Sequence, residues 1–82
     1  MNKKELLSKM VLHGDNGGTL SDYLGITRGT FSAKINETNG SEFTQKEIMM
    51  IKEKYNLTAE EIDTIFFTRE VSNLDTFSEE TA

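Results

Sequence analysis

Apolar residues recur at helical spacing in five segments of the chain, and short polar turns separate these segments. The first segment opens with Asn2 and Glu5, a capping-box-like pair, and ends at Gly14. Its apolar positions are Leu6, Leu7, Met10 and Val11. The three- and four-residue intervals predict an amphipathic helix that buries these side chains.

The second segment follows a turn signal at residues 14–18 and runs to Leu24. Asn16 and Thr19 are alternative caps for it. We favour Asn16, because that choice places Leu20 at the fourth helical position. Gly25 then ends the helix, since glycine readily takes the left-handed conformation that a tight turn between two helices requires.

The third segment begins at Thr27, which we expect to be the N-cap of a helix. Ile26 would pack against Phe31 as a hydrophobic staple. Phe31 and Ile35 are four residues apart and therefore share one buried face. Residues 37–42 form a polar loop before the next helix.

The fourth and fifth segments start with the same local pattern. Residues 43–48 and 57–62 each contain an apolar residue, a threonine cap, a glutamate three positions later and then an isoleucine. This arrangement is a capping box with a hydrophobic staple. The expected core positions are Ile48, Ile51 and Tyr55, and Ile62, Ile65 and Phe66. Residues 1–67 thus predict one all-α domain of five helices.

The last part of the chain, residues 68–82, differs from the rest. Arg69 and Val71 alternate with polar residues, which permits a short strand or arm, and residues 72–82 are acidic and polar like a flexible tail. Adjacent residues of a helix cannot share one face, so one of Phe66 and Phe67 completes the core and the other is exposed. We expect a dimer contact formed by Phe66, Phe67, Arg69 and Val71.

Residues 20–36 contain the most informative pattern, two helices joined by a tight turn. Ser21 is small enough for the two helices to cross closely. The residues of the third helix that we expect to be exposed are Arg28, Gly29, Ser32, Ala33 and Asn36. A helix that presents a small, polar face at its amino-terminal end fits the DNA major groove.

The amino terminus of this third helix is suited to an anion. Thr30 occupies the position where a capping-box glutamate would lie, so the positive end of the helix dipole remains open beside Arg28. We expect Arg28 to contact guanine O6 and N7, worth about 1–3 kcal/mol of discrimination. The predicted base-reading residues are Arg28, Gly29, Ser32 and Ala33. The predicted contacts to the DNA backbone are Gly17, Thr19, Thr27, Thr30, Lys34 and Asn36.

These residues resemble a known family. The order of residues 20–36 is similar to the helix-turn-helix of lambda-repressor-like proteins. His13-Gly14-Asp15, Phe43-Thr44…Glu47-Ile48 and Ile65-Phe66-Phe67 narrow the resemblance to small Cro-like repressors of phages and prophages of Gram-positive bacteria. The resemblance covers residues 3–71. It implies five helices, binding of operator DNA as a homodimer, and gene regulation in a lysogeny circuit.

The chain departs from that family at three positions. Gly17 stands where many relatives have a glutamine that touches phosphate, and Ser21 replaces the usual alanine. Ala33 stands where relatives often carry a larger polar or basic side chain. Gly17 thus lacks the side chain that contacts phosphate in those relatives, and Ala33 offers less to a base edge than their larger side chains.

The net charge of −5 weighs against DNA binding, but its distribution reduces the objection. Residues 1–36 hold five cations and three acids, and residues 37–82 hold four cations and eleven acids. The two segments thus carry net charges of +2 and −7. Lys3, Lys4 and Lys9 fit a solvated helix face, and an exposed lysine without a partner is the alternative reading of Lys34.

Composition excludes several other classes of protein. Cysteine is absent, the single histidine, His13, forms no metal site, and no nucleophile has an evident base partner. No apolar run approaches the roughly 18 residues of a membrane span, and residues 1–10 do not resemble a signal peptide. We expect a cytoplasmic protein that is not an enzyme and has no cofactor, metal, membrane partner or small-molecule substrate.

A second class of function competes with DNA binding. The chain could keep the helix-turn-helix fold as a protein-interaction module, such as an antirepressor or a binder of a host factor. The acidic charge and the small side chains at Gly29 and Ala33 motivate this alternative. Salt-sensitive binding to DNA would distinguish the two.

Overall fold

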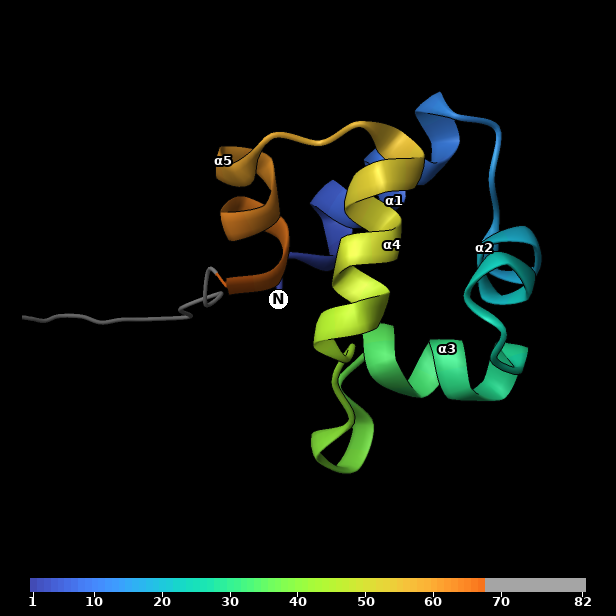
Figure 1. The fold of residues 1–82 in the computed structure, drawn as a ribbon. Coiled ribbons are helices and arrows are strands. Elements are labelled where there is room, and N and C mark those ends of the chain that lie inside the picture. The colour runs from blue at the N-terminus through green and yellow to red at the C-terminus, as the bar shows by residue number, and fades with distance from the viewer. Residues whose placement is uncertain (68–82) are drawn as a thin grey trace, which may run out of the picture.

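The structure, a computed structural model, describes residues 1–67, which form five α-helices and two short helical turns (Figure 1). The α-helices are α1 (Lys3–Leu12), α2 (Gly17–Leu24), α3 (Arg28–Ile35), α4 (Gln45–Tyr55) and α5 (Ala59–Ile62). A 3-10 turn, η1 (Thr38–Gly40), lies between α3 and α4, and a π-helical turn, η2 (Asp63–Phe67), continues α5. The predicted all-α class is confirmed. The predicted arm at Arg69 and Val71 and the acidic tail lie outside the described residues.

Local capping chemistry determines where each helix begins. The side-chain oxygen of every predicted cap accepts a hydrogen bond from the backbone N–H three residues later. These caps are Asn2, Asn16, Thr27, Thr44 and Thr58. Asn16 is therefore the correct choice for α2, and Gly25 takes the expected left-handed conformation at its end, with φ of 76°.

α4 runs through the middle of the molecule, with α2 and α3 on one side and α5 on the other (Figure 1). α2 and α3 contact each other directly. Ser21 is fully buried, and its hydroxyl donates to the carbonyl oxygen of Gly18 at 2.9 Å, so it satisfies its polar group within α2. The backbone N–H of Asn2 donates to the carbonyl oxygen of Ile65 at 2.6 Å, which ties the start of α1 to η2.

One hydrophobic core joins all five helices. Its buried members are Leu6, Met10, Leu20, Leu24, Phe31, Ile35, Phe43, Ile51, Tyr55, Leu57, Ile62 and Ile65. Two predictions for α1 are wrong: Leu7 is 38% exposed and Val11 is 75% exposed. α1 buries only the face that carries Leu6 and Met10, while Leu7 lines a cavity between α1 and α3. Ile48 is half-buried at the edge of this core.

Candidate nucleic-acid interface

The exposed face of α3 carries most of the residues predicted to read bases. Arg28, Gly29 and Ser32 are exposed, as expected. Ala33 is half-buried, which corrects the expectation that it belongs to the open face. A methyl group projects only a short way from a helix, so larger neighbours readily shield part of it. Three of the four predicted base-reading residues are therefore accessible to a partner.

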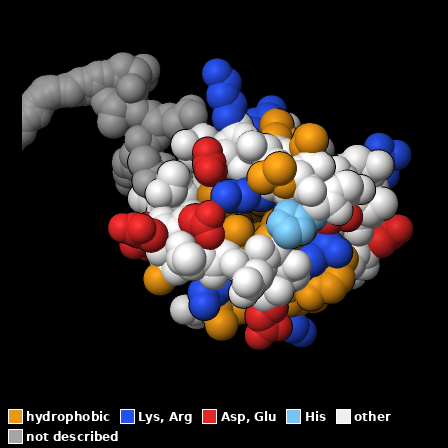
Figure 2. All heavy atoms as spheres, turned by 90° about the horizontal axis from the view of Figure 1, so that it is seen from above, with side chains coloured by type: hydrophobic (Ala, Val, Ile, Leu, Met, Phe, Trp, Pro, Cys, Tyr) orange, Lys and Arg blue, Asp and Glu red, His pale blue; other side chains and the backbone are white. Residues whose placement is uncertain are grey.

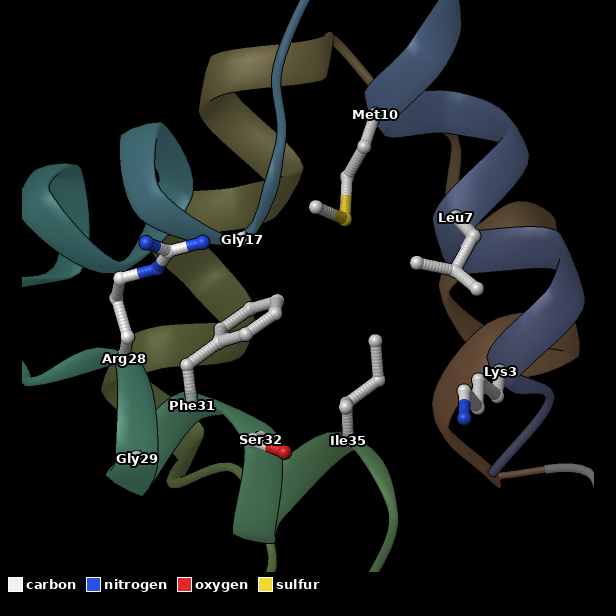
Figure 3. A pocket seen from close by; sticks show the side chains of 9 residues that line it. All are labelled: Lys3, Leu7, Met10, Gly17, Arg28, Gly29, Phe31, Ser32 and Ile35. Carbon is white, nitrogen blue, oxygen red and sulfur yellow. The ribbon is translucent and has the colours of Figure 1, made fainter.

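Arg28 lies at the junction of two helices. Its guanidinium folds back over the first turn of α2, where a Cβ added to Gly18 would lie 3.5 Å from Nε and 3.7 Å from Cζ. Figure 3 shows the guanidinium lying toward Gly17. Within residues 1–67, the Arg28 side chain has neither a hydrogen bond nor an ion pair. The amino-terminal ends of α2 and α3 thus share one exposed cation.

The charge distribution around that cation favours an anion. α2 and α3 carry no acidic residue in their first turns, whereas α1, α4 and α5 carry at least one each. The first N–H groups of a helix have no partner within the helix and bear a partial positive charge. Two such helix ends therefore lie beside the Arg28 guanidinium, and an oxyanion placed there would face only positive charge from these three groups.

The threonines predicted to contact the DNA backbone already serve as capping groups. Thr27 accepts a hydrogen bond from the backbone N–H of Thr30 at 3.1 Å, and their hydroxyls lie 2.9 Å apart. The Thr19 hydroxyl donates to Asp15 at 2.8 Å and accepts from the backbone N–H of Asn16 at 2.9 Å. All three threonines are exposed, while Gly17 is half-buried against the Phe31 ring. Their contacts with DNA remain predictions.

Lys34 is held by an acid of α4. Its Nζ donates to Oε1 of Glu47 at 2.7 Å, and both side chains are largely buried. The alternative reading of Lys34 as an unpaired surface lysine is therefore wrong. A phosphate contact by Lys34 stays a prediction, and it would require the ammonium to leave Glu47 or to bind both groups.

Two other lysines have partners that sequence analysis missed. Nζ of Lys3 donates to Oδ1 of Asn36 at 2.6 Å, and Nζ of Lys9 donates to Glu61 at 2.8 Å. These partners are 33 and 52 residues apart in the sequence, so no local pattern could reveal them. Lys4 is exposed, as predicted. Asn36, a predicted backbone contact, is also exposed, and its Nδ2 donates to the carbonyl oxygen of Ser32 at 3.0 Å.

The two adjacent phenylalanines divide their roles as predicted. Phe66 is half-buried, and its ring meets Phe43 edge to face with centroids 5.8 Å apart. Phe67 is 64% exposed. Arg69 and Val71, the other members of the predicted dimer contact, lie beyond the part of the chain that the structure describes. The dimer itself remains a prediction.

The end of the molecule opposite α3 has a mixed surface. Acidic, basic and apolar side chains are interspersed there, around the single histidine (Figure 2). The ring of His13 stacks on Tyr55 with centroids 4.6 Å apart. Among residues 1–67, no group of three or more histidine, aspartate or glutamate side chains could hold a metal ion. The features suited to an anion thus lie at the α2–α3 end.

A scan of protein-family models, a search of curated proteins and a search of solved structures found no match to this chain. No helix among the described residues has both the length and the apolar character needed to cross a bilayer.

Proposed function

We propose that this chain is a sequence-specific DNA-binding transcription regulator of the Cro-like, phage or prophage type. In this proposal the chain binds operator DNA as a homodimer in the cytoplasm, and α3 enters the major groove. Arg28 and Ser32 face the base edges, and the backbone of Gly29 approaches them without a side chain between. The amino terminus of α2 and the exposed threonines then contact the flanking phosphates.

One observation carries this proposal: Arg28 lies where the amino termini of α2 and α3 meet, and neither helix has an acidic residue in its first turn. Within the described chain nothing neutralises this cation, although the whole protein is acidic. A phosphate oxygen or the O6 and N7 atoms of guanine would supply the missing negative charge and acceptors. The neighbouring side chains of α3 are small enough for a groove to approach.

The test is selection of DNA from a random library with the full chain, followed by fluorescence anisotropy at several salt concentrations. We expect an enriched sequence whose affinity falls steeply as salt rises, because contacts to phosphates release counterions. Each neutralised phosphate contributes a slope of about −0.9 in log affinity against log salt. Absence of salt-sensitive binding at micromolar protein would refute the proposal.

Two substitutions at Arg28 then separate base reading from positioning. Arg28→Ala should weaken binding to the selected site more than binding to random DNA, by about tenfold or more. Arg28→Lys keeps the charge but loses the planar, forked guanidinium. Its affinity for random DNA should therefore change little, while much of the preference for the selected site over random DNA should be lost. Equal losses on both DNAs in Arg28→Ala would make Arg28 a phosphate contact. Lys4→Ala, an exposed lysine of α1, is the control.

The alternative is a protein-interaction module without DNA binding. The half-buried Ala33 and the pairing of Lys34 with Glu47 favour it, because both reduce what α3 offers to DNA. Such a module would bind its partner protein with little response to salt and would enrich no DNA sequence. The selection experiment therefore decides between the two classes of function.

A further inference from the structure

A cavity of about 390 Å³ opens between α1, the start of α2 and α3 (Figure 3). α1 contributes Lys3, Leu7 and Met10, α2 contributes Gly17, and α3 contributes Arg28, Gly29, Phe31, Ser32 and Ile35. This volume lies within the range of about 300–1,000 Å³ that is typical of small-molecule sites. Leu7 keeps 38% of its surface exposed because α3 does not close over it.

The cavity combines apolar walls with positive charge. Four of its nine lining residues are apolar, two are cations, and none is acidic, although acids outnumber lysines and arginines in the chain by fourteen to nine. The Lys3 ammonium donates to the neutral amide of Asn36, so its charge is not cancelled there. Arg28 has no partner among residues 1–67. The lining thus complements a molecule with an apolar body and a negative group.

We propose that this cavity binds a small amphipathic carboxylate whose apolar body is a hydrocarbon chain or an aromatic ring. The apolar body contacts the exposed side chain of Leu7 and the small parts of Met10 and Phe31 that line the cavity, where burial removes hydrocarbon surface from water. The carboxylate pairs with Arg28, because that guanidinium lacks a partner and the amino-terminal ends of α2 and α3 reinforce its field. Lys3 adds positive charge at the α1 side of the opening.

Occupation of the cavity would affect α3 directly. Arg28, Gly29 and Ser32 line the cavity and also form the face that we propose to read DNA. A carboxylate on Arg28 would therefore compete with DNA for the same guanidinium. This consequence rests on the proposed function, whereas binding of the carboxylate does not.

Binding is measured without DNA, by isothermal calorimetry and amide chemical shifts of the full chain with decanoate below its micelle concentration. We expect saturable one-to-one binding, with shifts concentrated in α1, in α3 and at Gly17. Decanol, which has the same chain length without the charge, should bind at least tenfold more weakly. Decanol binding as tight as decanoate, or shifts spread evenly over the protein, would overturn the proposal.

Substitutions place the ligand in the cavity. Leu7→Glu puts a carboxylate into the apolar wall and should weaken decanoate binding at least tenfold, whereas Leu12→Glu, 74% exposed on the same helix and outside the lining, should not. Arg28→Gln should weaken decanoate but not decanol. If Leu7→Glu unfolds, Ser32→Leu serves as the test instead. It narrows the cavity from the α3 side and should also weaken decanoate binding. Equal binding by Leu7→Glu and Leu12→Glu, both folded, would exclude this site.

A final measurement links the ligand to DNA. Decanoate should lower the affinity of the wild-type protein for its selected DNA but leave that of Leu7→Glu unchanged, because Leu7 lines the cavity and is not part of the face proposed to read DNA. Failure to bind decanoate refutes the cavity proposal whatever the DNA result. Failure to bind DNA refutes the proposed function and leaves the calorimetric result standing.

Discussion

Glu47 has two structural roles in α4. Its Oε1 accepts from the backbone N–H of Thr44 at 2.8 Å, which completes the capping box, and also accepts from Lys34 of α3 at 2.7 Å. Burial by itself would raise the pKa of the Glu47 carboxyl. The hydrogen bonds from Lys34 and Thr44 outweigh burial, so the pKa lies below its ordinary value. One buried carboxylate thus fixes α3 against α4.

Glu47→Gln should lower the free energy of unfolding by about 1 kcal/mol at neutral pH, because the amide oxygen can still accept both hydrogen bonds but lacks the charge that strengthens them. A carboxyl whose pKa is depressed on folding contributes stability above its unfolded pKa and loses it as the pH falls through the folded pKa. The difference in free energy of unfolding between wild type and variant should therefore be largest at pH 6–7 and should decrease below about pH 4. Urea unfolding at a series of pH values measures it.

Glu53→Gln is the matched control, since Glu53 is an exposed glutamate of the same helix. It should change the free energy of unfolding by less than about 0.5 kcal/mol. A Glu47→Gln difference that stayed constant down to pH 2 would show that the carboxylate charge is not what stabilises the contact.

Element boundaries were the part of the fold that the sequence predicted best. Each cap is a contact between residues three positions apart, so the chain encodes it locally. The burial of α1 was predicted less well, because its surroundings depend on α3, which begins sixteen residues after α1 ends. Leu7 satisfies the helical period but faces a cavity. The pairing of Lys34 with Glu47 was missed for the same reason.

The loop between α1 and α2 is anchored to α4 through Asp15. The Tyr55 hydroxyl donates to Oδ2 of Asp15 at 2.7 Å, the Thr19 hydroxyl donates to Oδ1, and Nζ of Lys54 lies 3.6 Å from Oδ2. The hydrogen bond from Tyr55 is the largest cause that lowers the pKa of Asp15. Burial, and then the neighbouring Asp15 carboxylate, raises the pKa of Tyr55. These contacts hold the amino terminus of α2 in place.

Tyr55→Phe removes that hydrogen bond and should lower the free energy of unfolding by about 1.5–3 kcal/mol near neutral pH. Because the pKa of Asp15 is depressed in the folded state, this loss of unfolding free energy should be largest above pH 4 and should become smaller at lower pH. Hydrogen exchange should also speed up at the first amides of α2. Tyr23→Phe, on the exposed side of α2, is the control and should change neither measurement.

At the scale of the whole molecule, charge and apolar surface divide between different regions. The features that would favour an anion lie where α2 and α3 begin, whereas the carboxyl-terminal half of the chain holds most of the acids. The exposed Phe67 ring borders a hollow of about 100 Å³ that is lined by apolar residues, such as Phe43 and Phe66, and by the charged residues Lys34, Glu37 and Glu42. An exposed aromatic ring can meet its own copy across a two-fold axis, so the two Phe67 rings of a dimer could pack against each other.

The proposed function requires a dimer that presents two α3 helices to half-sites about one turn, or roughly 34 Å, apart, and we propose Phe67 as its contact. Phe67→Glu should therefore weaken dimerisation by about 2 kcal/mol or more, roughly 30-fold, because it places a charge in an apolar contact. Sedimentation equilibrium measures this loss. The same variant should bind a single half-site like wild type but lose the advantage of the complete operator. Leu12→Glu is the control, since Leu12 is an exposed apolar residue of α1, and it should keep both dimerisation and the advantage of the complete operator. A monomeric wild type at DNA-binding concentrations, or a fully dimeric Phe67→Glu, would contradict this interface.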